Sequence, residues 1–127
     1  MAEVERDGGC QCGAVRFKVS GAPLCVGICH CQDCRRASGS FFMPFGVWPI
    51  SAYEGHEDVR QTQLLSAMRV AYRLRDNEAE IMLGSLDMAP SDLIPEYELW
   101  VPRREKWLMV LPWAEQFAGD RFRPSDP

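Results

Sequence analysis

The chain has 127 residues, 46% of them hydrophobic and 25% charged, with a formal net charge of -4 at pH 7. This length suits one compact domain whose core needs no disulfides, and the acidic balance, without a long run of lysine or arginine, argues against a nucleic-acid partner. The charged N-terminus lacks the apolar stretch of a signal peptide, and no apolar run reaches the roughly 18 residues of a membrane span. We therefore expect a cytoplasmic protein with no membrane partner.

Polar residues stand at both ends of the chain, and we expect residues 1–7 and 118–127 to be flexible. A single domain over residues 8–117 remains. It opens with a C-x-C pair, Cys10 and Cys12, flanked by glycines that permit a bent backbone. Thiols stay reduced in the cytoplasm, so the six cysteines of the chain more plausibly bind metal or do chemistry than form disulfides. The C-x-C pair could supply half of a zinc site.

Two strands are predicted next. Residues 14–20 alternate between apolar and polar side chains, which indicates a half-buried strand. Glycine and proline interrupt the pattern, and residues 24–29 form the second strand. Cys25 shares a face with Cys29, but four strand residues span about 13 Å, too far for a shared zinc. We therefore expect Cys25 to pack in the core.

Three cysteines then fall within six residues, and we call Cys29, Cys31 and Cys34 the cysteine knuckle. Zinc takes sulfur ligands at about 2.3 Å in a tetrahedral array, so a tight turn after Cys31 must bring the thiolates together. His30 points to the opposite face and is a poor ligand candidate. Three protein ligands without an evident fourth are typical of a catalytic zinc with an open position, and the alternative is three reduced, buried cysteines.

A short helix is expected after the knuckle, because residues 32–38 are polar and Gly39 suits the position just past a helix end. Arg35 and Arg36 would then stand beside the metal. Three thiolates on one zinc leave a net charge of about -1, which guanidinium groups would offset, and such groups also bind substrate carboxylates. The alternative is that both arginines are ordinary solvated surface.

A buried strand is predicted over residues 41–48, where Pro44 removes a ladder donor and suggests an edge or a bulge. Residues 49–57 are interpreted as a connection in which His56 is an exposed loop histidine. Residues 64–75 fit both helical spacing and alternation.

We favour a strand there, because Asp76 and Asn77 suit a two-residue turn and residues 78–83 alternate in their turn. The resulting hairpin pairs residue 73 with 80 and 75 with 78 on a charged surface, and 72 with 81 and 74 with 79 on an apolar face. Residues 96–101 alternate as a further strand, and residues 107–111 are predicted to be an apolar cover. Trp100, Trp107 or Trp113 could mark a homodimer surface or the core.

The chain resembles the glutathione-dependent formaldehyde-activating enzyme family, which also includes the centromere protein V domain. The resemblance rests on G-C-Q-C-G-A-V at residues 9–15, on C-H-C-Q-D-C-R-R-A-S-G-S at residues 29–40, on G-S-L-D at residues 84–87, and on residues 107–108 with 111–112. It implies a mostly β, tent-like zinc fold, a zinc on Cys29, Cys31 and Cys34 that is open to a thiol substrate, and carbon–sulfur lyase-type chemistry joining glutathione to formaldehyde.

One departure from the family pattern concerns Cys10 and Cys12. The family usually carries a second C-x-x-C about halfway along, which closes a four-thiolate structural zinc with the early C-x-C. No cysteine follows Cys34 in this chain, so only Cys25, a histidine, a carboxylate or water could complete such a site. We therefore expect no full structural zinc, and we expect apolar packing of the later hairpin to replace the stability that the metal would contribute.

Two functions are compatible with these motifs. The first is a zinc-dependent enzyme that joins a small thiol such as glutathione to an aldehyde, with Cys31 and Cys34 in the reactive centre and Arg35 and Arg36 binding the substrate. The second is a non-catalytic zinc-binding or interaction module that keeps the fold, because fold alone does not settle function.

Overall fold

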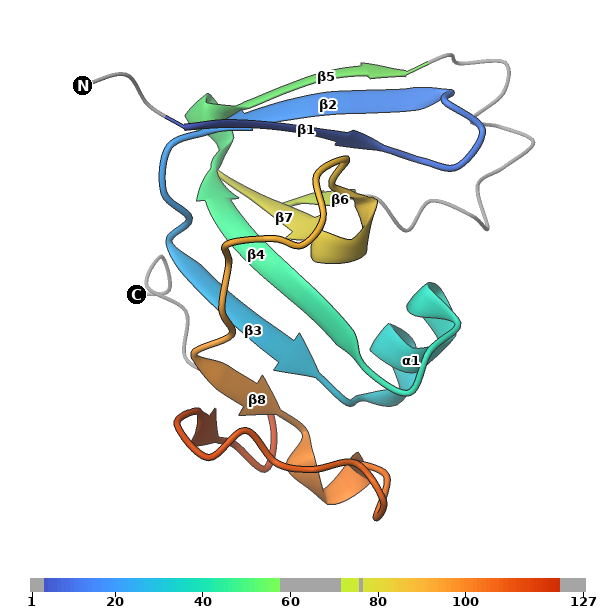
Figure 1. Cartoon of the computed structure of the whole chain (residues 1–127), viewed down its shortest axis with the longest axis vertical. Helices are drawn as coiled ribbons and strands as arrows, with labels where there is room; N and C mark the ends of the chain where they lie inside the picture. Colours follow the sequence, from blue (N-terminus) through green and yellow to red (C-terminus); the bar gives the residue numbers. More distant parts are fainter. Residues whose placement is uncertain (1–3, 58–71, 76, 122–127) are drawn as a thin grey trace.

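The computed structural model describes residues 4–57, 72–75 and 77–121. Within them the protein is mostly β, as predicted, with two sheets and one short helix (Figure 1). The smaller sheet is antiparallel and contains, in spatial order, β1 (Glu5–Gly9), β2 (Val15–Ser20) and β5 (Tyr53–Glu57). The larger sheet contains, in spatial order, β6 (Tyr72–Arg75), β7 (Glu78–Met82), β4 (Met43–Pro49), β3 (Cys25–Cys29), β8 (Tyr97–Leu99) and β9 (Glu115–Gln116).

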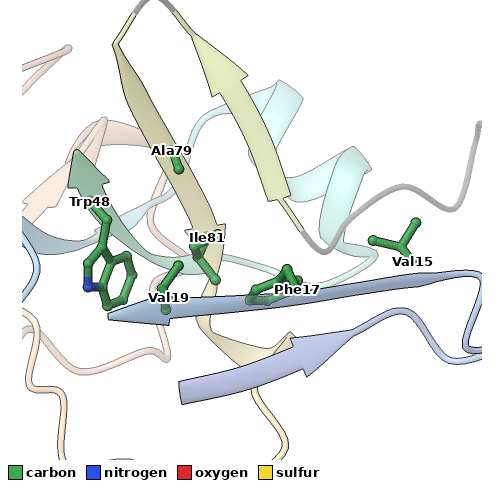
Figure 2. Packing of buried hydrophobic residues seen from close by; sticks show 6 residues of the cluster. All are labelled: Val15, Phe17, Val19, Trp48, Ala79 and Ile81. Atoms are coloured by element: carbon green, nitrogen blue, oxygen red, sulfur yellow. The ribbon is translucent and has the colours of Figure 1, made fainter. Parts of the chain in front are cut away.

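A first hydrophobic core joins the two sheets. The alternation seen in the sequence places one face of β2 against β4 and β7, and Figure 2 shows the side chains that meet there. The buried members are Val15, Phe17, Val19, Trp48, Ala79 and Ile81. The Trp48 indole N–H donates to the carbonyl oxygen of Gly21 at 3.0 Å, so the one polar atom of this large side chain is satisfied.

A second core lies on β3, β4 and β8, in contact with the cysteine knuckle. Its buried residues are Cys25, Cys29, Phe45, Val47, Tyr97 and Leu99, and Cys31 and Cys34 pack against it. Cys25 is buried there, as predicted, and the Tyr97 hydroxyl lies 3.3 Å from its sulfur. Strand β8 pairs in parallel with β3, an arrangement that brings the late part of the chain beside Cys29.

The predicted hairpin is confirmed in its register. Strand β6 pairs with β7 so that residues 72, 73, 74 and 75 stand opposite 81, 80, 79 and 78. The predicted burial is wrong at three residues: Leu74 is 47% exposed, whereas Glu78 and Glu80 are buried. The reason is topological, since β7 lies between β6 and β4 and β6 is an edge strand. Residues 64–71 of the predicted strand lie outside the described residues.

Several other segments differ from the sequence-based expectations. Strand β1 begins at Glu5, within the stretch expected to be flexible. The expected connection after β4 contains a 3-10 turn (Ile50–Ala52) and β5, so His56 belongs to a strand and not to a loop. Pro44 lies in an interior strand, but pairing of β4 with β7 begins only at Phe45, so its missing N–H removes no bond to β7.

The last third of the described chain also departs from the prediction. Strand β8 ends at Leu99 because Trp100 adopts a left-handed backbone with φ of 58°, and a 3-10 turn (Val101–Arg103) follows. The expected apolar cover is largely exposed: Trp107 is 65% and Met109 84% accessible. This segment pairs with no strand among the described residues, and Trp107 packs edge-on against Phe41 at 5.4 Å between ring centroids. In the described part of the chain, no helix is long and apolar enough to cross a membrane.

Candidate metal centre

The three knuckle cysteines come together where β3 meets the helix α1 (Gln32–Ser38). Cys29 is the last residue of β3, Cys31 is the N-cap of α1, and Cys34 lies in the first turn of that helix. Their sulfur atoms all lie within 4.8 Å of one another. Among the residues that the structure describes, this is the group of metal-ligating side chains that meets that distance.

Local hydrogen bonds explain why the C-x-x-C segment turns here. The Cys31 sulfur accepts a hydrogen bond from the Cys34 backbone N–H at 3.3 Å, which satisfies one of the donors left open at the start of the helix. At the other end, Gly39 takes the left-handed conformation with φ of 68° and donates its N–H to the carbonyl oxygen of Arg35. The predicted helix and its glycine end are thus confirmed.

Hydrogen bonding and burial give the three knuckle thiols different pKa values. A hydrogen bond from the Cys34 thiol lowers the pKa of Cys29 to about 7. The same hydrogen bond, in which Cys34 is the donor, raises the pKa of Cys34, with burial acting in the same direction. Burial raises the pKa of Cys31. Of the three knuckle thiols, Cys29 therefore loses its proton at the lowest pH, and hydrogen bonds from its neighbours stabilise the thiolate.

The donor set fits zinc. Tetrahedral zinc with bonds of about 2.3 Å to sulfur separates its sulfur ligands by about 3.8 Å, and the observed separations of up to 4.8 Å need only a small closure to reach it. Thiolate sulfur also selects zinc over magnesium, calcium or manganese. Three ligands from the protein leave one tetrahedral position for a molecule from solution.

His30 is not part of the cysteine group, in agreement with the sequence-based expectation. Its fully buried ring places Nε2 2.8 Å from Oε1 of Glu98, which is also buried. Burial opposes ionisation of Glu98, but hydrogen bonds from Gln116 and His30, among others, outweigh it, so the pKa of Glu98 is lowered. An ionised carboxylate only accepts, so Nε2 of His30 is the donor in this hydrogen bond.

Sequence reasoning missed Glu98. The alternation of residues 96–101 placed it on the outer face of its strand, yet Tyr97, Glu98 and Leu99 are all buried. Its Oε2 accepts hydrogen bonds from the Leu111 backbone N–H at 3.0 Å and from the Gln116 amide at 2.9 Å, and the Arg104 guanidinium lies 3.3 Å away. The sequence does not distinguish Glu98 from the exposed Glu96, because both alternate with Tyr97 and Leu99 in the same pattern.

The two arginines of α1 have different surroundings. Arg35 forms an ion pair with Glu105 at 2.8 Å, donates to the carbonyl oxygen of Arg103, and lies over the Phe41 ring. Arg36 is exposed, and the Gln32 amide oxygen lies 2.9 Å from its terminal nitrogens once that amide is turned to its better hydrogen-bonding orientation. Glu105 is a second residue that sequence spacing did not reveal, since it is 70 residues from its partner.

Cys10 and Cys12 lie at the tip of the β1–β2 hairpin, with their sulfur atoms 3.3 Å apart. Within the described residues they have no third ligand near enough to form a metal group. Burial opposes the Cys10 thiolate, but the Val15 backbone N–H and the Cys12 thiol lower its pKa.

Comparison with known protein families matches residues 5–103 to the glutathione-dependent formaldehyde-activating enzymes. The chain belongs to this family. The match contains β1 through the 3-10 turn after β8, and so includes both cysteine motifs, Arg35, Arg36 and Glu98. It ends before Trp107, which the resemblance noted in the sequence also used. A search of functionally curated proteins gives no match. Membership in the family supports a glutathione- and formaldehyde-related function for the knuckle.

Proposed function

We propose that this protein is a zinc-dependent enzyme of the carbon–sulfur lyase type, which joins a small thiol such as glutathione to formaldehyde or a related aldehyde. In this reaction the thiol sulfur forms a bond to the carbonyl carbon, and the thiol proton ends on the carbonyl oxygen. The observation that carries the proposal is the convergence of the Cys29, Cys31 and Cys34 sulfur atoms within 4.8 Å in a chain of this family.

The knuckle residues would hold the zinc. When bound, the metal supplies a Lewis-acid site that lowers the pKa of a thiol. Cys29 would provide the anchor, because it is buried in the second core and is the first of the three to lose its proton. Cys31 and Cys34 would close the set from α1, and their partial exposure leaves room for a substrate on the solvent side.

Arg35 and Arg36 would orient the substrate carboxylates. Guanidinium–carboxylate pairs are charge-assisted and planar, which suits the two carboxylates of glutathione. Arg35 already bonds Glu105, so a substrate must compete with that carboxylate for it. Arg36 is exposed on the same helix, and among the described residues its hydrogen-bond partner is the neutral Gln32 amide, so it would be the stronger contributor.

A second candidate is a non-catalytic zinc-binding module. Two observations favour it: the early C-x-C pair lacks a third ligand among the described residues, and Arg35 is held in an internal ion pair. Both functions require the zinc, so thiol binding and turnover separate them.

Calorimetric titration of zinc-loaded protein with glutathione, compared with chelated protein, tests the first function. We expect binding heat only with zinc, and an increase in the rate of the thiol–formaldehyde addition over the uncatalysed reaction. Arg36→Ala should weaken binding by about 1.5 to 3 kcal/mol, and Lys18→Ala, on the smaller sheet, is the matched charge control. Equal heats with and without zinc would reject the enzyme, and binding without any rate increase would favour the module.

Zinc content gives an independent prediction. We expect about one zinc per chain by metal analysis, and its loss in Cys31→Ser, because Cys31 belongs to both the C-x-C and the C-x-x-C halves of the knuckle. Cys25→Ser, which changes a buried cysteine outside the group, should keep the metal. Two tightly bound zincs per chain would contradict the prediction.

A further inference from the structure

The hairpin tip between β1 and β2 holds a pair of thiols that the proposed function does not use. The Cys10 and Cys12 sulfur atoms are 3.3 Å apart, and a disulfide bond is about 2.05 Å long, so bond formation requires the sulfurs to approach by about 1.2 Å. Cys12 is exposed and Cys10 half-buried. The pair is therefore both close enough to join and accessible to a small molecule.

The backbone around the pair favours one thiolate. The Cys10 sulfur accepts the Val15 backbone N–H at 3.2 Å, a hydrogen bond that stabilises negative charge on that sulfur. The side chain of Arg16 lies over this end of the hairpin, and the charge of Cys10 contributes to raising the pKa of Arg16. The Arg16 guanidinium is itself bonded to Asp87, so the Val15 N–H is the contact that favours the Cys10 thiolate.

The backbone at the hairpin tip can also adjust so that a disulfide between Cys10 and Cys12 forms. Gly13 has φ of 82° and no atom near the position of a Cβ, and its N–H bonds the Cys10 carbonyl oxygen. Residues 11–13 are exposed, so a change in their backbone leaves the first core intact. The register of β1 and β2 ends at the pair of residues 9 and 16, before the tip.

From this geometry we infer that Cys10 and Cys12 form a redox-active dithiol that is oxidised by low-molecular-weight disulfides of the glutathione disulfide type. The Cys10 thiolate attacks one sulfur of the disulfide, forms a mixed disulfide and expels one thiolate. The Cys12 thiolate then attacks the Cys10 sulfur, forms the protein disulfide and expels the second thiolate. Two protein thiols lose two electrons and two protons, and the disulfide becomes two thiols.

This inference does not depend on zinc in the knuckle or on the proposed enzyme activity. A disulfide in so short and exposed a loop is expected to be easily reduced, as regulatory disulfides are. The pair would thus respond to the ratio of disulfide to thiol around the protein, and its product is the same class of thiol that the knuckle is proposed to bind.

The test is peptide mapping by mass spectrometry of zinc-loaded protein incubated with glutathione disulfide. Trypsin cuts after Arg6 and Arg16, so Cys10 and Cys12 share one peptide, and the other four cysteines fall on the peptide from Val19 to Arg35. We expect the first peptide to lose the mass of two hydrogens and to regain it with a dithiol reductant. Cys12→Ser should instead accumulate one glutathione adduct on Cys10, and Cys10→Ser should form its adduct more slowly.

Three results would overturn the inference. The first is a Cys10–Cys12 peptide that stays fully reduced, and the second is one that carries two glutathione adducts without an internal disulfide. The third is a lower zinc content in Cys10→Ser than in the unchanged protein, which would assign the pair to a metal. Serine keeps a hydrogen-bonding side chain at the exposed position 12 and at the half-buried position 10, which packs against the first core. Far-ultraviolet circular dichroism verifies that each variant is folded.

Discussion

At the scale of single residues, Glu98 links more of the protein than any sequence pattern suggested. Its carboxylate joins the ring of His30, between two knuckle cysteines, to Arg104, Leu111 and Gln116 in the late part of the chain. The backbone N–H of His30 also bonds the carbonyl oxygen of Leu99 at 3.1 Å. The position of the knuckle backbone therefore depends on segments about 70 residues away.

Glu98→Gln tests this link. An amide puts an N–H₂ group where a carboxylate oxygen now accepts hydrogen bonds, so at least one buried donor loses its acceptor. We expect a loss of about 1 to 3 kcal/mol in the free energy of unfolding, measured with urea. Glu96→Gln, at an exposed position two residues earlier, is the matched control and should change stability by less than about 0.5 kcal/mol. Equal effects of the two substitutions would contradict the role of Glu98.

Asp87 offers a pH-dependent contribution to stability. Hydrogen bonds from the Arg16 guanidinium, one of them 3.1 Å long, lower the pKa of Asp87 below its ordinary value of 3.8. A carboxylate with a lowered folded-state pKa stabilises the protein above its ordinary value, and the contribution is lost as the pH falls through the folded-state pKa. Both side chains are nearly half exposed, so solvent and salt screen the effect.

Asp87→Asn should therefore lower the melting temperature slightly at neutral pH. The difference from the unchanged protein should shrink as the pH falls below the ordinary value of 3.8 and vanish below the lower folded-state pKa. Thermal melts over a pH series, at low and at high salt, measure it. A difference that persists unchanged in acid would show that the substitution acts through packing and not through charge.

At the scale of elements, local patterns predicted the strands whose two faces differ. Alternation located β2, and the two-residue turn together with alternation on both sides gave the register of β6 and β7. Strands β1 and β5 escaped because Glu5–Gly9 and Tyr53–Glu57 are polar or glycine-bearing, and only their pairing with β2 makes them strands. Such tertiary pairing overrides weak local preference.

For the candidate site, too, the sequence predicted only the local part. The spacing of Cys29, Cys31 and Cys34 predicted a cluster, because residues within one turn are close whatever the rest of the chain does. Glu98 and Glu105 were not predictable, since their contacts with His30 and Arg35 join segments that only the parallel pairing of β3 with β8 and the turns after it bring together.

Strand β3 contains Gly27, where neighbouring rings leave no room for a larger side chain. A Cβ at Gly27 would lie 2.7 Å from the Tyr97 ring and 3.1 Å from the Phe45 ring, inside the second core. Gly27→Ala should lower the free energy of unfolding by about 1 to 3 kcal/mol through overpacking, measured with urea. Gly84→Ala, where a Cβ meets no atom within 4 Å, is the control and should be nearly neutral. If the two variants are equally stable, the ring of Tyr97 moves aside at little cost.

At the scale of the whole molecule, the first core joins the two sheets, and the second core supports the candidate metal centre. The first core is built from β2, β4 and β7 and contains no knuckle cysteine, whereas the second contains Cys29 and borders Cys31 and Cys34. Hydrophobic side chains of the first core thus join the two sheets without a knuckle residue. Metal at the knuckle would then stabilise one end of the molecule and not its whole fold.

Chelation of the zinc-loaded protein should consequently loosen that end alone. We expect amide hydrogen exchange, followed by mass spectrometry, to accelerate across Cys29 and α1, because ligands of a removed metal no longer restrain each other. Exchange in β2 and β7 should stay slow, since their pairing and burial in the first core do not involve the knuckle. Cys31→Ser is the control: it should show the fast exchange at α1 from the outset and respond no further to the chelator. If protection disappears everywhere at once, the metal holds the entire fold, and the two cores form one cooperative unit.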